Sequence, residues 1–221
     1  MIVNELISDR IPSVKSTDSA GMALDWMNEF KINQIPIVDD GKYVGIVTEN
    51  DIMECRDLDV PIGEIRYSGW DSAYIYQGNH VYDAIEMLSN LNLEILPVLD
   101  EENGFLGVIT LHDLSSYLGR LFAIHEPGGI LVLEIPRHSY VLSEIGRIAE
   151  SADAKVLSLY LAPVKETNDL LLTLKLNLED LTRVVASFER FDYKVIRTYH
   201  KISRMDDYQE NLDALIKYLD L

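Results

Sequence analysis

Gly45-Ile-Val-Thr-Glu-Asn-Asp51 and Gly107-Val-Ile-Thr-Leu-His-Asp113 are two versions of one pattern. Each begins with glycine, continues with two β-branched residues and ends with Thr-x-x-Asp. The β-branched pair predicts a strand, and threonine followed three residues later by a carboxylate predicts the start of a helix. The chain therefore passes twice through the same kind of strand-to-helix corner, which indicates an internal repeat.

The residues before each corner repeat as well. Gln34–Asp39 and Ile95–Asp100 are short apolar runs of strand length, with Pro36 and Pro97 at the same place in each. A polar turn separates each run from the glycine that follows it. Each copy therefore predicts a β-hairpin that leads into a helix.

A further helix precedes each hairpin. Ala20–Met27 and Val81–Leu88 carry apolar residues at helical spacing. Asp18 or Ser19 is placed to cap the first of these helices, and Asn79 the second. We assign residues 1–62 to the first βαββα-type unit and residues 63–124 to the second.

Charge divides the chain near residue 128. The 221 residues carry a net charge of −18. Residues 1–127 hold 22 acidic and 7 basic side chains, whereas residues 128–204 hold 10 acidic and 11 basic ones. Such an acidic first half repels nucleic acid and anionic membranes, so we expect neither as a partner.

The remaining composition is that of an ordinary globular protein. The single cysteine, Cys55, excludes a disulfide within the chain. No apolar run reaches the roughly 18–20 residues that a membrane helix needs. The first residues lack the basic and apolar segments of a secretion signal. We therefore expect a cytoplasmic protein.

The repeated pattern resembles the CBS domain, in the tandem arrangement usual for that family. The resemblance implies an α+β or α/β fold in which two units pack sheet against sheet. It also implies clefts between the units that bind an adenosine compound. The expected ligands are AMP, ADP or ATP, with Mg²⁺, or S-adenosylmethionine, and no cofactor or metal site is predicted beyond these.

The resemblance gives roles to particular residues. Asp51 and Asp113 would hold a ribose, and Thr48 and Thr110 would contact phosphate or ribose. Strand segments and the two prolines would sandwich the base. The residues concerned are Val14, Ser16, Thr17, Ile35, Pro36, Ile75, Gln77, Leu96 and Pro97. Thr-x-x-Asp is also a capping box, which stabilises a helix start without any ligand.

Cations that could neutralise a phosphate are few at these corners. The first corner adds an acid, Glu49, and the second offers only His112. His112 is equally well interpreted as a solvent-exposed residue on the first turn of the helix, without a role in binding. Arg10 and Lys15 are expected near the first cleft. Because a phosphate close to a carboxylate costs about 1 kcal/mol or more per pair, we expect the Asp113 cleft to be the better site. A ligand of low charge, or one that arrives with Mg²⁺, should fit better than bare ATP.

The second half predicts a different domain, residues 130–204, after the breaker His125–Gly129. The predicted elements are strand Ile130–Ile135, helix Ser139–Ala152, strands Lys155–Pro163 and Asp169–Leu178, helix Glu179–Phe191 and strand Tyr193–Ile202. The order βαββαβ is ferredoxin-like. A terminal amphipathic helix is predicted within residues 205–221.

This second domain resembles the ACT domain, a class that often binds amino acids. Ligand-binding members usually have glycine in or near the first strand-to-helix loop, whereas Pro136–Tyr140 has none. We therefore expect the domain to pair sheets or helices between protomers.

The combined order suggests a function. A CBS pair followed by an ACT-like domain resembles the acetoin-utilisation regulatory proteins of bacteria. We expect a non-catalytic, homodimeric regulator that senses a small ligand and acts on an unknown protein. The alternative is a scaffold that dimerises without a ligand. An enzyme is the remote alternative, because the sequence shows no Ser/His/Asp or Cys/His constellation, no P-loop and no metal-ligand spacing.

Overall fold

The computed structural model describes residues 2–8, 10–65, 72–165 and 167–199. The chain divides into two compact units, of which the first, residues 1–117, contains both βαββα-type repeats and the second is residues 118–221. This division falls inside helix α4 (Leu111–Leu121), earlier than the boundary that we placed after residue 124. The reason is that Phe122, directly after the helix, belongs to the second unit, where its carbonyl accepts a 2.9 Å hydrogen bond from Ser158 Oγ. The helix predicted within residues 205–221 lies outside the described residues.

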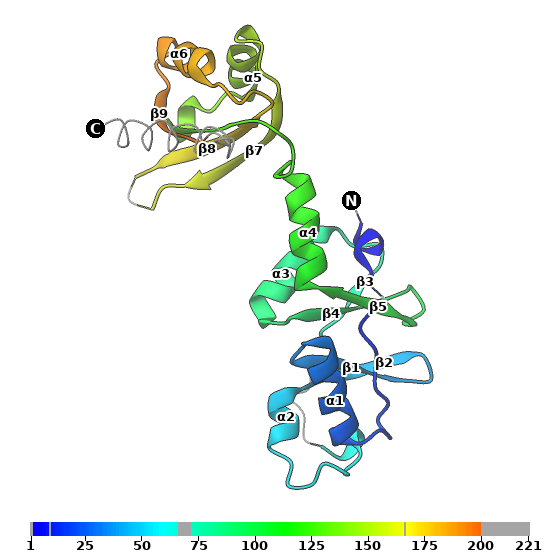
Figure 1. Cartoon of the computed structure of the whole chain (residues 1–221). Coiled ribbons are helices and arrows are strands. Elements are labelled where there is room, and N and C mark those ends of the chain that lie inside the picture. Colours follow the sequence, from blue (N-terminus) through cyan, green and yellow to red (C-terminus); the bar gives the residue numbers. More distant parts are fainter. Residues whose placement is uncertain (1, 9, 66–71, 166, 200–221) are drawn as a thin grey trace, which may run out of the picture. The chain divides into compact units, whose positions relative to one another are not determined.

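The first repeat contains a helix, a hairpin and a short helix (Figure 1). Its elements are α1 (Ala20–Phe30), β1 (Gln34–Asp39), β2 (Lys42–Thr48) and α2 (Glu49–Met53). β1 and β2 pair antiparallel, as the sequence predicts. Val14, expected in a strand, makes only an isolated parallel bridge with Ile37.

The second repeat has the same order and one more short strand. Its elements are β3 (Ile75–Tyr76), α3 (Val81–Leu91), β4 (Ile95–Leu99), β5 (Phe105–Thr110) and α4. β4 pairs antiparallel with β5 and parallel with β3. Short 3₁₀ turns lie at Val3–Leu6, Ile62–Glu64 and, in the second unit, Arg137–Ser139.

The two helix caps show one correct and one wrong prediction. Ser19 caps α1, and its Oγ accepts a 3.3 Å hydrogen bond from Met22 N. His80 rather than Asn79 caps α3, because its Nδ1 accepts from Tyr82 N at 3.2 Å. A histidine imidazole therefore does here what a short polar side chain usually does at a helix start.

The hairpins of the two repeats are joined by backbone and side-chain hydrogen bonds. Phe105 N donates to Gly41 O at 2.9 Å. Glu94 accepts from the amide Nδ2 of Asn33 at 3.1 Å, and its own backbone N donates to Gln34 Oε1 at 2.9 Å. The two repeats therefore form one compact unit.

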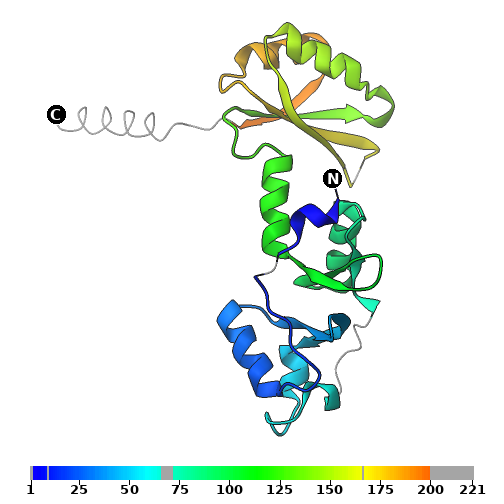
Figure 2. The ribbon, with the colours of Figure 1, turned by 90° about the vertical axis from the view of Figure 1, so that its right-hand side faces the viewer.

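The second unit is a four-stranded antiparallel sheet with two helices on one face (Figures 1 and 2). Its elements are β6 (Ile130–Pro136), α5 (Leu142–Ser151), β7 (Val156–Pro163), β8 (Asp169–Leu176), α6 (Thr182–Arg190) and β9 (Lys194–Tyr199). The strand order β7-β8-β6-β9, with every neighbouring pair antiparallel, is the predicted ferredoxin-like arrangement.

Alternate residues of the two central strands form the core of the second unit. Leu131, Leu133, Leu172 and Leu174 have no exposed surface, and Phe188 of α6 packs into the same cluster. Burial of this kind contributes about 1.5–3 kcal/mol for each large apolar side chain. Among the described residues, no helix is long and apolar enough to cross a membrane.

Tyr193 makes the stability of the second unit depend on pH. Burial first, and then the 3.1 Å hydrogen bond that its hydroxyl donates to Glu144 Oε2, raise the pKa of Tyr193 to about 12. A raised pKa favours the protonated phenol, so its contribution is complete below about pH 10 and is lost as the pH rises towards about 12. Denaturant unfolding should show the native chain losing stability over this range. Tyr193→Phe should lose less, and an equal loss in both chains would contradict the account.

Candidate functional site

The two strand-to-helix corners are both capping boxes. Thr110 Oγ1 donates to Asp113 Oδ2 at 2.6 Å and accepts from Asp113 N at 3.1 Å. Thr48 and Asp51 make the same pair of bonds, at 2.7 and 3.1 Å. In both copies, therefore, Thr-x-x-Asp forms the capping box that stabilises a helix start without a ligand. Each threonine hydroxyl proton is already used by a carboxylate, so the threonine cannot donate to a phosphate while the box is intact.

The capping box uses only part of the Asp113 carboxylate. Its hydrogen bonds from Thr110 both end on Oδ2. Within the described part of the chain, no hydrogen bond reaches Oδ1. A carboxylate oxygen has lone pairs for two donors, so Oδ1 is suited to accept a hydroxyl of a bound sugar.

The backbone at the start of α4 has little to give to an anion. Leu111 N donates to Glu94 O at 3.1 Å, and Asp113 N is taken by the Thr110 hydroxyl. Free backbone N–H groups are the usual reason that helix starts bind phosphate. Any phosphate at this corner must therefore be held mainly by side chains.

A pocket of about 460 Å³ opens at the second corner, and we name it the Asp113 pocket. Four separate segments of the first unit line it. They are Ser8, Arg10 and Ile11; Phe30, Lys31, Ile32 and Asn33; Glu94 and Ile95; and Thr110, Leu111, His112 and Asp113. The corner expected from the sequence to be the better site thus faces open space.

Arg10 lies at this pocket and not near Asp51, which corrects the expectation from the sequence. The cause is a backbone pairing over a long sequence distance. Ser8 and Val108 form an antiparallel bridge, with N to O distances of 2.8 and 3.1 Å in the two directions. Gly107 permits it, because its φ is +144° and an added Cβ would lie 2.8 Å from Ser8 O.

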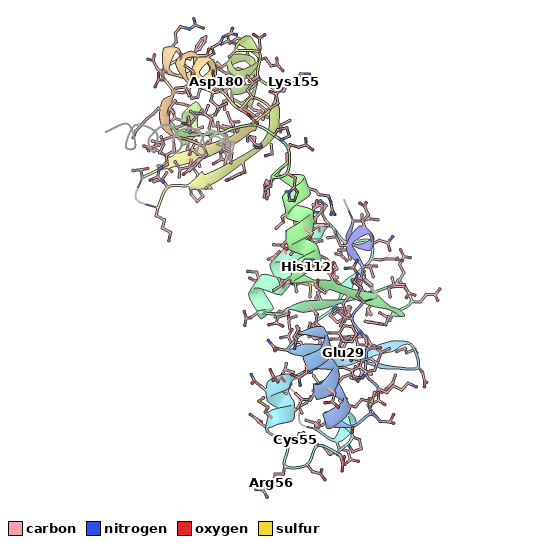
Figure 3. The ribbon with its side chains drawn as sticks, in the orientation of Figure 1. Glu29, Cys55, Arg56, His112, Lys155 and Asp180 are labelled. Atoms are coloured by element: carbon pink, nitrogen blue, oxygen red, sulfur yellow. The ribbon has the colours of Figure 1, made fainter. Side chains whose placement is uncertain are left out.

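The Asp113 pocket has two bases without an ionic partner. Among the described residues, no carboxylate lies within 4.0 Å of Arg10 or Lys31. His112 lies in the first turn of α4 (Figure 3). Glu94, the other acid of the lining, is held by Asn33, whose backbone N donates to its Oε2 at 3.2 Å. The lining therefore combines two bases and a histidine with two acids.

The pocket beside Asp51 has the opposite charge. Its volume is about 340 Å³, and Cys55 and Arg56, after the end of α2, contribute to it (Figure 3). The complete lining is Asp51, Glu54, Cys55, Arg56, Asp57, Val60, Glu64 and Ile65. Four carboxylates face one arginine there, so an anionic ligand would be repelled.

The other predicted site residues lie elsewhere, and none of them lines either pocket. Most are buried within the two repeats, because β1 and β4 are covered on both faces and are buried along most of their length. The buried ones are Val14, Ile35, Pro36, Ile75, Leu96 and Pro97; Ser16 and Gln77 are half-buried, and Thr17 is exposed.

The polar groups of Ser16 are used within the protein. Its backbone N donates to Asp39 Oδ1 at 2.9 Å, and its hydroxyl donates to Asp39 Oδ2. These two hydrogen bonds, the side-chain one foremost, hold the pKa of Asp39 below its ordinary value. Ser16 therefore fastens a loop to β1.

Comparison with known proteins agrees with the repeat. Residues 3–57 and 69–120 each match the model of the CBS domain. Inosine-5'-monophosphate dehydrogenase of Methanocaldococcus jannaschii is 28% identical over 112 residues, which is 50% of this chain and 22% of that enzyme. An uncharacterized 17.7 kDa protein of Acidianus ambivalens is 25% identical over 120 residues, 52% of this chain and 72% of its own.

The fold of the first unit also occurs among solved structures. A CBS domain pair/ACT domain protein from Thermotoga maritima superposes with a TM-score of 0.50 at 24% identity, and covers 55% of this chain and 99% of its own. The twofold family match, the sequence repeat and this fold agree. Residues 3–57 and 69–120 of the chain are a tandem pair of CBS domains.

Proposed function

We propose that the CBS pair is a non-catalytic sensor that binds one adenosine nucleotide in the Asp113 pocket. The observation that carries this proposal is the meeting of Arg10, Lys31 and Asp113 around one cavity. Among the described residues neither base has a carboxylate within 4.0 Å, so both charges are available to an anion bound in the pocket. A bound phosphate would supply the missing negative charge.

The remaining lining suits the other parts of a nucleotide. Asp113 Oδ1 is placed to accept a ribose hydroxyl. Phe30, Ile11 and Ile95 offer apolar and aromatic surface to a purine ring. The volume lies within the roughly 300–1,000 Å³ that is typical of small-molecule pockets.

The charges also rank the candidate ligands. The two bases of the Asp113 pocket reduce the need for Mg²⁺, so AMP should bind without a metal ion. ADP and ATP carry more negative charge than these cations neutralise, and Mg²⁺ should strengthen their binding. S-adenosylmethionine is disfavoured, because its sulfonium would lie near Arg10 and Lys31.

A second candidate function has its own observation. The capping boxes at Thr48 and Thr110 stabilise both corners without any ligand. Several large apolar side chains of the CBS pair are exposed, among them Met53, Tyr82 and Leu111, at 66%, 62% and 48%. In a dimer, exposed apolar side chains of this kind would be removed from water, which is favourable. A ligand-free homodimeric scaffold is therefore the alternative, and nucleotide titrations distinguish it from the sensor.

Thermal-shift and calorimetric titrations with AMP and adenosine test the proposal. AMP should raise the melting temperature with concentration, because it binds the native state alone. Adenosine should bind about tenfold or more weakly, because it lacks the group that contacts Arg10 and Lys31. Failure of AMP, ADP, ATP and S-adenosylmethionine to stabilise the chain would favour the scaffold.

Asp113→Ala and Asp51→Ala form a matched pair of variants. Each removes one capping box and should cost a similar 0.5–2 kcal/mol or so of stability. Only Asp113→Ala should abolish the AMP-induced shift, since only this carboxylate lies beside the two bases. Equal losses of AMP binding in the two variants would contradict the choice of pocket.

A further inference from the structure

The sheet of the second unit has one face that α5 and α6 do not cover (Figure 2). Side chains on this face come from three neighbouring strands. In the register of the sheet, Lys175 of β8 lies opposite Ile130 of β6 on one side and Ser158 of β7 on the other. Thr173 and Tyr160 form the next pair. These residues make one continuous patch.

The chain before β6 closes part of this patch. Phe122 and Ile124 border it, and the Phe122 ring packs edge-on against Tyr160 with 5.5 Å between centroids. Ser158 Oγ fixes the same segment through its 2.9 Å hydrogen bond to Phe122 O. The space enclosed is about 440 Å³, and we name it the open-face pocket.

Lys175 is the charged group of the open-face pocket. Its Nζ donates to Gly128 O at 2.8 Å, which uses one of the three ammonium protons. No carboxylate lies within 4.0 Å of it among the described residues, whereas Lys194 of the same sheet is paired with Glu134 at 3.0 Å. Lys175 is half-buried, so water solvates its charge only in part.

We infer that the open-face pocket binds a small carboxylate with an apolar body. The two remaining ammonium protons of Lys175, with the Thr173 hydroxyl beside them, can hold the carboxylate. Phe122, Tyr160 and Ile130 provide the apolar wall for a phenyl or branched alkyl group.

The same lining selects against amino acids. It contains no acidic side chain, so an α-ammonium group would lie beside Lys175 without a counter-charge. A simple or 2-oxo acid therefore fits better. The open-face pocket shares no residue with the Asp113 pocket, so this inference does not depend on the proposed nucleotide binding.

Titration of the ¹⁵N-labelled full chain with 3-phenylpropanoate tests the inference by NMR. We expect saturable shifts of the amides of Ser158, Tyr160 and Thr173. The neutral 3-phenylpropanamide should bind about tenfold or more weakly, because it cannot form the charge-assisted bonds. L-phenylalanine should also bind more weakly. Absence of saturable shifts, or equal affinity for acid and amide, would overturn the inference.

Three variants localise the binding. Lys175→Met should lose the preference for acid over amide, whereas Lys194→Met should keep it, because Lys194 is paired outside the pocket. Thr173→Phe retains the lysine and fills the space, so it should abolish binding of both compounds in a chain that keeps its native circular dichroism. Undiminished binding to Thr173→Phe would show that the compound lies elsewhere and would overturn the inference.

Discussion

Gly128→Ala is expected to unfold the second unit under conditions in which the native chain is folded. Gly128 has a φ of +136°, and an added Cβ would lie 1.9 Å from the backbone oxygen of Leu176. Leu176 is fully buried at the end of a central strand, so its backbone cannot move away cheaply. The expected loss is about 4 kcal/mol or more, which places the substitution among the exceptional ones.

Gly146→Ala is the matched control for this prediction. Gly146 lies inside α5, and a Cβ added there would meet nothing within 4 Å. Alanine in a helix interior is worth up to about 1 kcal/mol over glycine, so the variant should be as stable as the native chain or more so.

Denaturant unfolding of the Gly128→Ala and Gly146→Ala variants measures these effects, and two optical signals distinguish the two units. Trp26 and Trp70 both belong to the first unit, so tryptophan fluorescence follows that unit alone, whereas circular dichroism follows both. Gly128→Ala should change the circular dichroism transition and leave the fluorescence transition nearly as it was. A Gly128→Ala chain as stable as Gly146→Ala would show that the close approach to Leu176 is not part of the native fold.

The double substitution Arg10→Met with Lys31→Met is expected to weaken AMP binding by about two orders of magnitude. Each hydrogen bond to a charged group is worth about 1.5–3 kcal/mol, or roughly tenfold or more in affinity. Methionine keeps most of the length and apolar character of each side chain. Adenosine binding should change little, because the substituted groups meet only the phosphate. Calorimetric titration of both ligands measures the two effects together.

Lys15→Met provides the control for the double variant. Lys15 is an exposed base of the same repeat that does not line the Asp113 pocket. Its loss should leave the AMP affinity within about twofold of the native value, because salt screens an exposed charge that makes no contact with the ligand. A loss of AMP affinity in Lys15→Met as large as in the double variant would mean that the affinity depends on the net charge of the acidic half and not on Arg10 and Lys31 in particular.

The elements that the sequence predicted best are those set by neighbouring residues. The Thr-x-x-Asp corners, the hairpins with Pro36 and Pro97, and the βαββαβ order depend on capping, turns and periodicity over a few residues. The same motif nevertheless starts helices of different length. α2 ends at Met53, whereas α4 continues to Leu121. After α2 the chain forms turns and bends up to Pro61 instead of continuing the helix.

The cations of the Asp113 pocket could not be placed from the sequence, because their position depends on a distant pairing. Arg10 lies at the second corner since Ser8 pairs with Val108, about a hundred residues away. Lys31 reaches the same pocket from the end of α1, in the other repeat. Gly107 was the sequence signal for a close backbone contact, but a glycine in a strand is equally typical of a bulge or a bend.

The open-face pocket was missed for a related reason. Alternation along β6 and β8 shows which side chains face the core, and Ile130 and Lys175 lie on the other face. Periodicity does not say which segment covers that face. The contact between Phe122 and Tyr160 joins residues 38 positions apart and is visible only in the folded chain.

The most direct test of the nucleotide site is to map AMP onto the ¹⁵N-labelled chain by amide chemical shifts. We expect saturable changes confined to the lining of the Asp113 pocket, at Arg10, Lys31, Thr110 and His112, whereas the amides of Asp51 to Arg56 should not shift. Changes centred on Asp51, or none at any AMP concentration, would contradict it.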